Sequence, residues 1–303
     1  MQPTNNTKAI IALTYVCLMW GTTYLAIRIG VLHFPAFLFA GIRQTCAGLM
    51  LFPIALYFNK QTNLSWRNIG RQMMIGFLML TLGNGCVSWG EKYIPSGVAA
   101  LICSAMPMFA VGINLIANPK EHFNILIAIG MLLGVAGVAL IFRQNLADLG
   151  NPAYLKGMGV VFIATCTWAL GSIINKKDST AKNPMFNSAL QLFFGGLFML
   201  ILSPVTDDLQ HIDWQQKQAF AALLYLIIFG SVLAYTAYMY ALNHLPVGVA
   251  TIYAYINPLV AVLLGYLVLH ETLNIYTALA FAAIVAGVYI VNLGYKKAHR
   301  KTN

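Results

Sequence analysis

The sequence contains little charge and very little acid. Only 9% of its 303 residues are charged and 59% are hydrophobic, whereas soluble domains carry about 25% charged residues. Eight Asp and Glu residues stand against 18 Lys and Arg residues, which gives a net charge of +10. A composition this apolar excludes an ordinary soluble domain and predicts a protein that lies in a lipid bilayer.

The signatures of several enzyme and cofactor classes are missing too. The five cysteines all fall inside apolar stretches and none forms a C-x-x-C pair, which argues against a disulfide framework and a metal site. His270-Glu271 begins like a zinc metalloprotease helix, but Asn274 stands where the second histidine would be. The sequence has no Walker A motif and no aspartate inside an apolar stretch. We therefore expect no catalytic residue, no metal and no cofactor.

Ten apolar segments are long enough to cross a hydrocarbon core of about 30 Å, which takes about 20 helical residues. They cover residues 9–29, 35–58, 72–91, 96–117, 123–142, 155–174, 186–206, 219–241, 248–269 and 275–294. The first is expected to be a retained span, because its apolar stretch is too long for a signal peptide. The sequence thus predicts an all-α polytopic membrane protein with ten transmembrane helices.

The chain carries an internal repeat. Residues 93–111 align without a gap with residues 244–262, at an offset of 151. The alignment pairs Pro95 with Pro246, Gly97 with Gly248 and Pro107 with Pro258. Such duplication is typical of transporter folds. We expect two five-helix repeats, residues 1–147 and residues 148–303. Because five is odd, the two repeats must be inverted relative to each other.

The positive charge gathers on one side of this topology. With a cytoplasmic N-terminus, 12 of the 18 Lys and Arg residues fall in inner segments and five in outer ones, while six of the eight acidic residues lie outside. Basic residues favour the cytoplasmic side of a membrane. Both termini are therefore expected in the cytoplasm, and the surplus charge is a topology signal that does not indicate nucleic-acid binding.

Arg43 is the one basic residue left inside a span. It lies eight residues beyond Pro35, which is about 12 Å along a helix. An ionisable residue at such depth is costly and is a functional candidate, although a snorkelling or structural arginine is the alternative. The equivalent position of the second repeat holds Gln191. A cavity with a charge on one side and an amide on the other would suit a substrate with one anionic end.

Other candidates are polar or aromatic residues near the middle of spans, and the two prolines of the repeat. We interpret Pro107 and Pro258 as helix breaks with a gating role, because proline removes a backbone donor and frees a carbonyl; a purely structural kink is the alternative. Tyr253 is interpreted as a belt or packing residue. The residues expected to bind substrate are Trp20, Arg43, Asn84, Trp168, Gln191, Tyr235, Tyr255 and Asn257.

Short sequence motifs that follow one another in a fixed order suggest a family. They are Trp20-Gly21-Thr22-Thr23-Tyr24, Arg43, Gly83-Asn84, Pro95-Ser96-Gly97, Gly230-Ser231 and Tyr255-Ile256-Asn257-Pro258. In these motifs the chain resembles, over essentially its whole length, the EamA-type permeases of the drug/metabolite transporter superfamily. Within it the chain is most similar to YedA-like bacterial inner-membrane proteins. The resemblance implies an alternating-access carrier in the inner membrane, usually an exporter of amino acids, metabolites or amphipathic compounds. The stretch Asn118-Pro119-Lys120-Glu121 departs from the family pattern.

We therefore expect a secondary transporter that works without ATP, with a small-molecule substrate and the lipid bilayer as its partners and no nucleic acid. Proton coupling and uniport both stay open, and a proton relay would have to use Glu91 or Glu271. A monomer and a homodimer also stay open. The alternative function is a membrane channel or a membrane-embedded scaffold that binds a partner, and a membrane enzyme ranks third.

Overall fold

In the computed structural model, the regular secondary structure of the described residues is entirely helical. These are residues 3–106, 108–109, 112–113, 125–144, 151–176, 183–209, 212, 215–245, 250, 253–270 and 275–300, and no strand occurs among them. The first half contains α1 (Pro3–Val31), α2 (Ala36–Phe58), α3 (Trp66–Gly76), the π-helix η1 (Phe77–Gly85), α4 (Cys86–Gly90), α5 (Ser96–Cys103) and α7 (Ile125–Gln144). The second half contains α8 (Pro152–Lys176), α9 (Pro184–Thr206), α10 (Lys217–Tyr225), the π-helix η3 (Leu226–Leu233), α11 (Ala234–His244), α13 (Tyr253–Leu269) and α14 (Ile275–Arg300).

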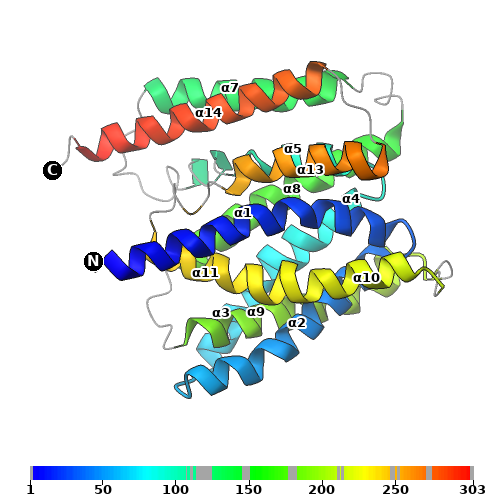
Figure 1. Ribbon diagram of the computed structural model, residues 1–303, viewed down its shortest axis with the longest axis vertical. Helices are drawn as coiled ribbons and strands as arrows, with labels where there is room; N and C mark the ends of the chain where they lie inside the picture. Colours follow the sequence, from blue (N-terminus) through cyan, green and yellow to red (C-terminus); the bar gives the residue numbers. More distant parts are fainter. Residues whose placement is uncertain are drawn as a thin grey trace.

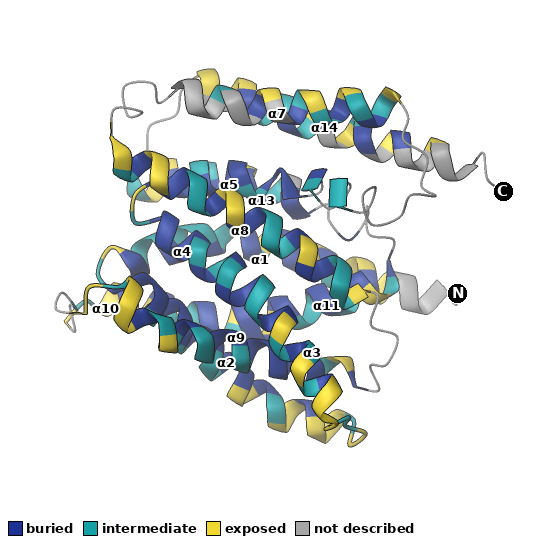
Figure 2. Ribbon diagram, turned by 180° about the vertical axis from the view of Figure 1, so that it is seen from behind, coloured by how far each residue is buried: buried dark blue, intermediate teal, exposed yellow. Residues whose placement is uncertain are grey.

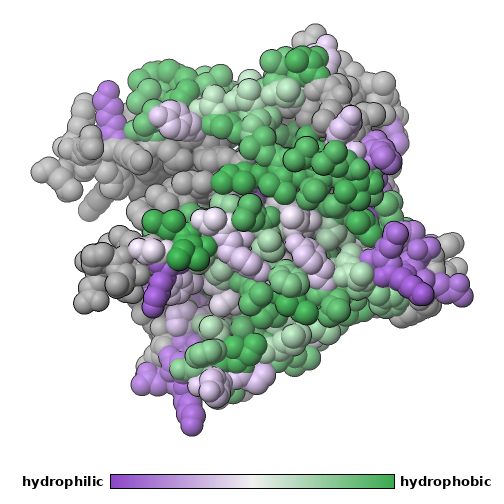
Figure 3. Space-filling view, viewed as in Figure 1, coloured by the Kyte–Doolittle hydropathy of each residue, from purple (hydrophilic) through white to green (hydrophobic). Residues whose placement is uncertain are grey.

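Six helical stretches are long and apolar enough to cross a membrane. They are Thr7–Val31, Ala36–Phe58, Trp66–Gly90, Pro152–Lys176, Pro184–Thr206 and Lys217–His244. Shorter apolar helices cover Ile125–Gly134, Ile256–Leu269 and Ala278–Val291. Large hydrophobic side chains are exposed on many of these helices, and a hydrophobic band covers the middle of one face with hydrophilic groups at its edges (Figure 3). Such a surface suits lipid, so the chain is a polytopic membrane protein.

The helices pack as a bundle with a close pair at each edge (Figure 1). α7 and α14 run side by side at one edge, and α2 and α9 run side by side at the other. α1, α5, α8, α13 and the α10–η3–α11 stretch lie between these pairs, where buried positions concentrate (Figure 2). The start of α1 and the end of α14 lie at the same end of the bundle.

The fourth expected span differs from the sequence prediction of one helix over 96–117. α5 ends at Cys103, and Ser104 and Ala105 form a turn in which Ser104 Oγ donates to Leu101 O at 2.7 Å. The ring of a proline clashes with the carbonyl four residues earlier, and residue 107 is a proline. α5 therefore ends at Cys103, the residue whose carbonyl group the ring of a proline at position 107 would meet in a continuous helix. Pro107 itself lies outside the described residues.

Two π-helices lie at equivalent positions of the internal repeat. η1 begins at Phe77 and η3 at Leu226, 149 residues apart, and each is continuous with α-helix on both sides. π-Helical turns are rare and occur frequently at functional sites. In η1 the Thr81 hydroxyl donates to Gly195 O at 2.9 Å, which joins this segment to α9.

Small residues bring α7 and α14 together. A Cβ atom added at Gly287 would lie 2.6 Å from the Gly130 carbonyl oxygen, and one added at Gly130 would clash in the same way with the Gly287 carbonyl oxygen. Glycines at a helix interface allow this close approach of two backbones.

We predict that Gly130→Ala lowers stability by about 1–3 kcal/mol, because the added methyl group forces α7 and α14 apart. Gly159 in α8 is the matched control, since a Cβ atom there meets nothing within 4 Å, and alanine favours a helix by up to about 1 kcal/mol over glycine. The thermal unfolding temperatures of both purified variants measure the difference. Equal unfolding temperatures would contradict this packing.

Candidate substrate-binding cavity

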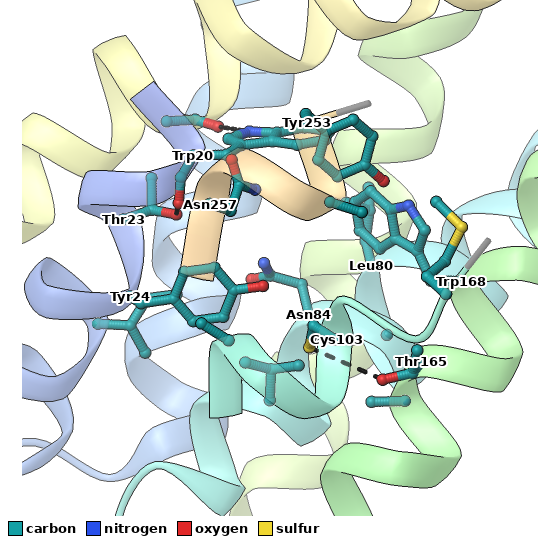
Figure 4. Close-up of a pocket in the computed structure, with 18 of the residues that line it drawn as sticks. Trp20, Thr23, Tyr24, Leu80, Asn84, Cys103, Thr165, Trp168, Tyr253 and Asn257 are labelled. Atoms are coloured by element: carbon teal, nitrogen blue, oxygen red, sulfur yellow. Dashed lines mark hydrogen bonds between the residues drawn. The ribbon is translucent and has the colours of Figure 1, made fainter. Parts of the chain in front are cut away.

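A cavity of about 90 Å³ lies inside the bundle, lined by residues of α1, α2, η1, α4, α5, α8, η3, α11 and α13. A single water needs about 10–15 Å³ on the same measure, so the cavity has room for a small organic molecule. Figure 4 shows its aromatic and polar side chains converging from different helices. Among the described residues that line it there is one charged side chain, Arg43, and no carboxylate.

Arg43 is almost completely buried, with 2% of its surface exposed. Its Nε donates to Ser231 Oγ at 2.8 Å, and its Nη1 donates to Asn84 Oδ1 at 3.3 Å. Asn84 belongs to η1 and Ser231 to η3, so the two π-helices hold the guanidinium from two sides. Glycine at position 230 leaves space here, because a Cβ atom would lie 2.9 Å from Thr23 Cγ2 and 3.1 Å from Arg43 Nη2.

Aromatic rings form the wall at one side of the cavity. The Trp20 ring lies 5.6 Å from that of Trp168 and 4.9 Å from that of Tyr253, both nearly edge to face. The three rings lie close together above the cavity in Figure 4. Trp20 Nε1 donates to Gly230 O at 3.1 Å, which ties the wall to η3. Such rings provide a large apolar contact surface with fixed geometry.

Asn257 lies next to Pro258 inside α13 and joins that helix to α1. In the amide orientation that satisfies both of its polar atoms, Nδ2 donates to Cys17 O and to Tyr253 O, each at 3.0 Å. Pro258 is buried within the helix and is not among the residues that line the cavity. α13 continues as α-helix through Pro258, so the helix break expected at this proline is not present.

Six of the eight residues expected to bind substrate line this one cavity: Trp20, Arg43, Asn84, Trp168, Tyr235 and Asn257. Gln191 does not line it, and the Tyr255 side chain lies outside the described residues. Sequence reasoning missed Tyr24, Cys103, Ser104 and Thr165 as cavity residues. Of the two interpretations of Tyr253, belt or packing, the structure agrees with packing, since its ring packs against Trp20 in the cavity wall. Tyr24 could have been found, since it follows Trp20 by about one helical turn.

Gln191 belongs to a buried group of amides that we term the amide cluster: Asn68, Gln72, Asn175, Asn187 and Gln191. Gln191 Nε2 donates to Gln72 Oε1 at 2.6 Å and to Asn175 Oδ1 at 2.8 Å, while Tyr235 OH donates to Gln191 Oε1 at 2.6 Å. Gln72 Nε2 donates to Asn68 Oδ1 at 3.1 Å, and Asn68 Nδ2 donates to Asn187 Oδ1 at 3.2 Å. These bonds connect α3, α8, α9 and α11. They lie at the end of the bundle where α3 and α9 begin and where α8 ends.

The amide cluster and the Arg43 contacts contain equivalent pairs. Arg43 and Gln191 are 148 residues apart, and Asn84 and Tyr235 are 151 residues apart, which are offsets of the internal repeat. Both pairs are hydrogen-bonded, Arg43 to Asn84 and Tyr235 to Gln191. The first pair is charged and lies at the cavity. The second is neutral: Tyr235 lines the cavity, and Gln191 belongs to the amide cluster.

Comparison with known proteins identifies the family. The EamA-like transporter family matches residues 7–143 and again residues 155–293. The chain belongs to the EamA-like transporter family. The Escherichia coli (strain K12) protein named "Uncharacterized inner membrane transporter YedA" is 33% identical over 285 residues, which cover 93% of this chain and 90% of that protein. The Bacillus subtilis (strain 168) "Uncharacterized transporter YvbV" is 26% identical over 96% of this chain and 94% of its own length. Family and relatives are named as transporters, so we assign the chain as a membrane transporter.

A solved crystal structure shares the fold. It aligns with a TM-score of 0.70 at 18% sequence identity, covering 96% of this chain and 98% of its own. At this identity the likeness establishes the arrangement of the helices and nothing about the substrate.

We predict that Gln191→Ala destabilises the protein. The change removes three hydrogen bonds from a buried site, and an unsatisfied buried polar group costs about 1–3 kcal/mol. Gln61→Ala, at an exposed position, is the control and should leave the unfolding temperature unchanged. An unfolding temperature for Gln191→Ala equal to that of Gln61→Ala would exclude a structural role for the amide cluster.

Proposed function

We propose that the protein is a secondary transporter for a small organic molecule with one anionic group, and that it works by alternating access. The single observation that carries this proposal is a buried guanidinium at the wall of a cavity whose described lining contains no carboxylate. Because no carboxylate shares the described cavity wall with Arg43, an anion that enters the cavity is favoured there over a neutral or cationic molecule.

The geometry around Arg43 leaves part of its guanidinium for a ligand. Ser231 and Asn84 accept from Nε and Nη1, whereas Nη2 makes no hydrogen bond with any described residue. The planar guanidinium matches the geometry of a carboxylate, and charge-assisted hydrogen bonds of this kind are about twice as strong as neutral ones. The rings of Trp20, Trp168 and Tyr253 would then contact the apolar part of the substrate.

Alternating access would follow from the ten-helix architecture with two inverted five-helix repeats, residues 1–147 and residues 148–303. The equivalent positions of η1 and η3, and the equivalent pairs Arg43–Asn84 and Gln191–Tyr235, support this symmetry. In an inverted repeat the halves exchange conformations, so that one central site opens to each face in turn. The amide cluster would close one end of the bundle in the present state and separate in the other.

The membrane and the direction of transport belong to the same proposal. The charge distribution favours both termini in the cytoplasm, and the relative named as an inner membrane transporter supports an inner-membrane location. The resemblance to exporters supports outward net movement. The amide cluster would then face the cytoplasm, because it lies at the end of the bundle where α1 begins.

The proposal is tested on purified protein with a panel of small carboxylates, sulfonates, amino acids, sugars and organic cations. A ligand that binds only the folded state raises the unfolding temperature, and we expect anions to give the largest rise. Uptake of the best anion into proteoliposomes should saturate with concentration. Uptake that rises without limit would instead favour a channel, and no ligand effect with no flux would favour a scaffold.

Arg43→Gln should abolish most transport while leaving abundance in the membrane near normal. It removes the cation that the substrate needs, yet it relieves an insertion cost of about 2.5–3.5 kcal/mol. Flux per molecule is expected to fall at least about tenfold, the equivalent of about 1.4 kcal/mol of lost interaction. Arg43→Lys should also weaken transport, because lysine lacks the planar geometry. Arg67→Gln, at an exposed position, is the control. Wild-type flux in Arg43→Gln would remove Arg43 from the site.

The orientation of the termini is tested with single cysteines in a background without native cysteine. A cysteine at Arg67 or Lys297, both exposed positions, should be shielded from an impermeant thiol reagent in intact cells. A cysteine at Asn151, also exposed, should react. Reaction at Lys297 together with protection at Asn151 would reverse the orientation.

A further inference from the structure

Glu91 is a fully buried carboxylic acid beside the cavity, with 0% of its surface exposed. It caps the C-terminal end of α4, and it follows Val87 and Asn84 by four and seven residues, which places all three on one helix face. Asn84 and Val87 line the cavity. An acidic residue buried in a membrane helix is costly and generally has a function, and the substrate contacts proposed above do not use Glu91.

The charged and titratable groups near Glu91 come from α1, α2 and α8, which pack against α4, and from α5. From α1, the Arg28 guanidinium donates to the Glu91 main-chain oxygen, and Tyr24 lies within reach of the charge of Glu91. From α2, Arg43 donates to Asn84, which lies on the same helix face as Glu91. From α5, Cys103 lines the cavity and accepts from Thr165 Oγ1 at 3.7 Å. α8 packs Gly157 against Gly90, and its Lys156 lies 4.8 Å from the centre of the Trp89 ring.

Other acids are less suited to respond to the cavity. One carboxylate oxygen of Asp207 accepts from Leu38 N at 2.9 Å and from Ser203 Oγ at 3.0 Å, so this group holds the start of α2 and the end of α9. Asp208 is exposed, and Glu271 lies outside the described residues. Among the described acids, Glu91 alone is fully buried, and it shares a helix face with Asn84, the residue that Arg43 Nη1 contacts.

We propose that Glu91 is the proton-binding group of the transporter, and that it takes up one proton when an anion binds at Arg43. This inference rests on the proposed function. With the cavity empty, the positive charge of Arg43 favours the ionised carboxylate. An anion at Arg43 neutralises the guanidinium and repels the ionised carboxylate of Glu91. Protonation of Glu91 therefore becomes favourable. By reciprocity, protonation of Glu91 strengthens anion binding by the same factor.

The consequence is that anion and proton cross the membrane together. The loaded carrier holds one anion on Arg43 and one proton on the Glu91 carboxylate, and both leave on the other side, so that no bond other than the O–H bond is made or broken. The sum of the anion gradient and the proton gradient across the membrane sets the direction of net movement. Outward movement is driven by a high internal concentration of the anion and carries a proton out with it.

The test uses the full chain in detergent and toluenesulfonate as the anion. A sulfonate stays ionised near neutral pH, so any proton taken up must bind to the protein. Toluenesulfonate is added to weakly buffered protein that contains a pH indicator, and the proton uptake is divided by the amount of anion bound. Wild-type protein should take up between zero and one proton per anion, with uptake that rises to a maximum at one pH and falls on either side of it.

Glu91→Gln should bind toluenesulfonate with no linked proton uptake. Glu91→Asp should keep the uptake and move its maximum to lower pH, because aspartic acid is intrinsically the stronger acid. Asp208→Asn, which removes an exposed acid, is the matched control and should behave as wild type. If Glu91→Gln does not fold, the shift of the maximum in Glu91→Asp decides the assignment.

The outcomes separate the two proposals. Toluenesulfonate binding without proton uptake in wild-type protein would overturn the role of Glu91 and leave the anion transporter intact. Proton uptake that persists in Glu91→Gln, or that keeps its maximum in Glu91→Asp, would assign the proton to another group. Failure of toluenesulfonate and of every anion of the ligand panel to bind would overturn the proposed function itself.

Discussion

A guanidinium that lies deep in a membrane protein must be solvated by the protein, and much of the central structure can be understood from this requirement. Arg43 is solvated by Ser231 and Asn84, which reside on the two π-helices. Gly230 leaves room for its Nη2 and accepts from Trp20 through its carbonyl oxygen. One buried charge thereby constrains the residues at 84, 230 and 231 and fixes one ring of the aromatic wall.

The equivalent positions of the second half meet a different requirement, because they hold helices together without charge. Gln191 uses both polar atoms of its amide on Gln72, Asn175 and Tyr235. A neutral hydrogen bond contributes only about 0.5–1.5 kcal/mol net, since its groups bond to water when it breaks. A cluster of amides can therefore join helices specifically and still separate at a modest cost in free energy. A buried ion pair would resist opening more strongly, because breaking it leaves uncompensated charge.

Much of the cavity could be predicted from the sequence, because an arginine, an asparagine or a tryptophan in the middle of an apolar span has few roles other than facing the interior. Gln191 shows where this reasoning stops. The repeat makes it equivalent to Arg43, yet only Arg43 lines the cavity, because tertiary packing decides which of two equivalent side chains faces a cavity and no local pattern contains that packing. The sequence does not predict the π-helices, because the apolar segments FLMLTLGNG and LIIFGSVL have the composition of an ordinary membrane-spanning α-helix. Tyr253 lies near a helix end and was therefore assigned to the membrane belt or to packing.

Charge balance gives coupling between anion and proton a simple physical origin. In the empty carrier the positive Arg43 and the ionised Glu91 sum to zero, and in the loaded carrier the bound anion offsets Arg43 while Glu91 is neutral. The two half-loaded states, anion without proton and proton without anion, each carry a net charge in a site without acidic residues among its described lining. Burying an unbalanced charge costs several kcal/mol even after the protein relaxes. The balanced states should therefore dominate the population that rearranges, and this alone ties one proton to one anion without a separate gate that senses both.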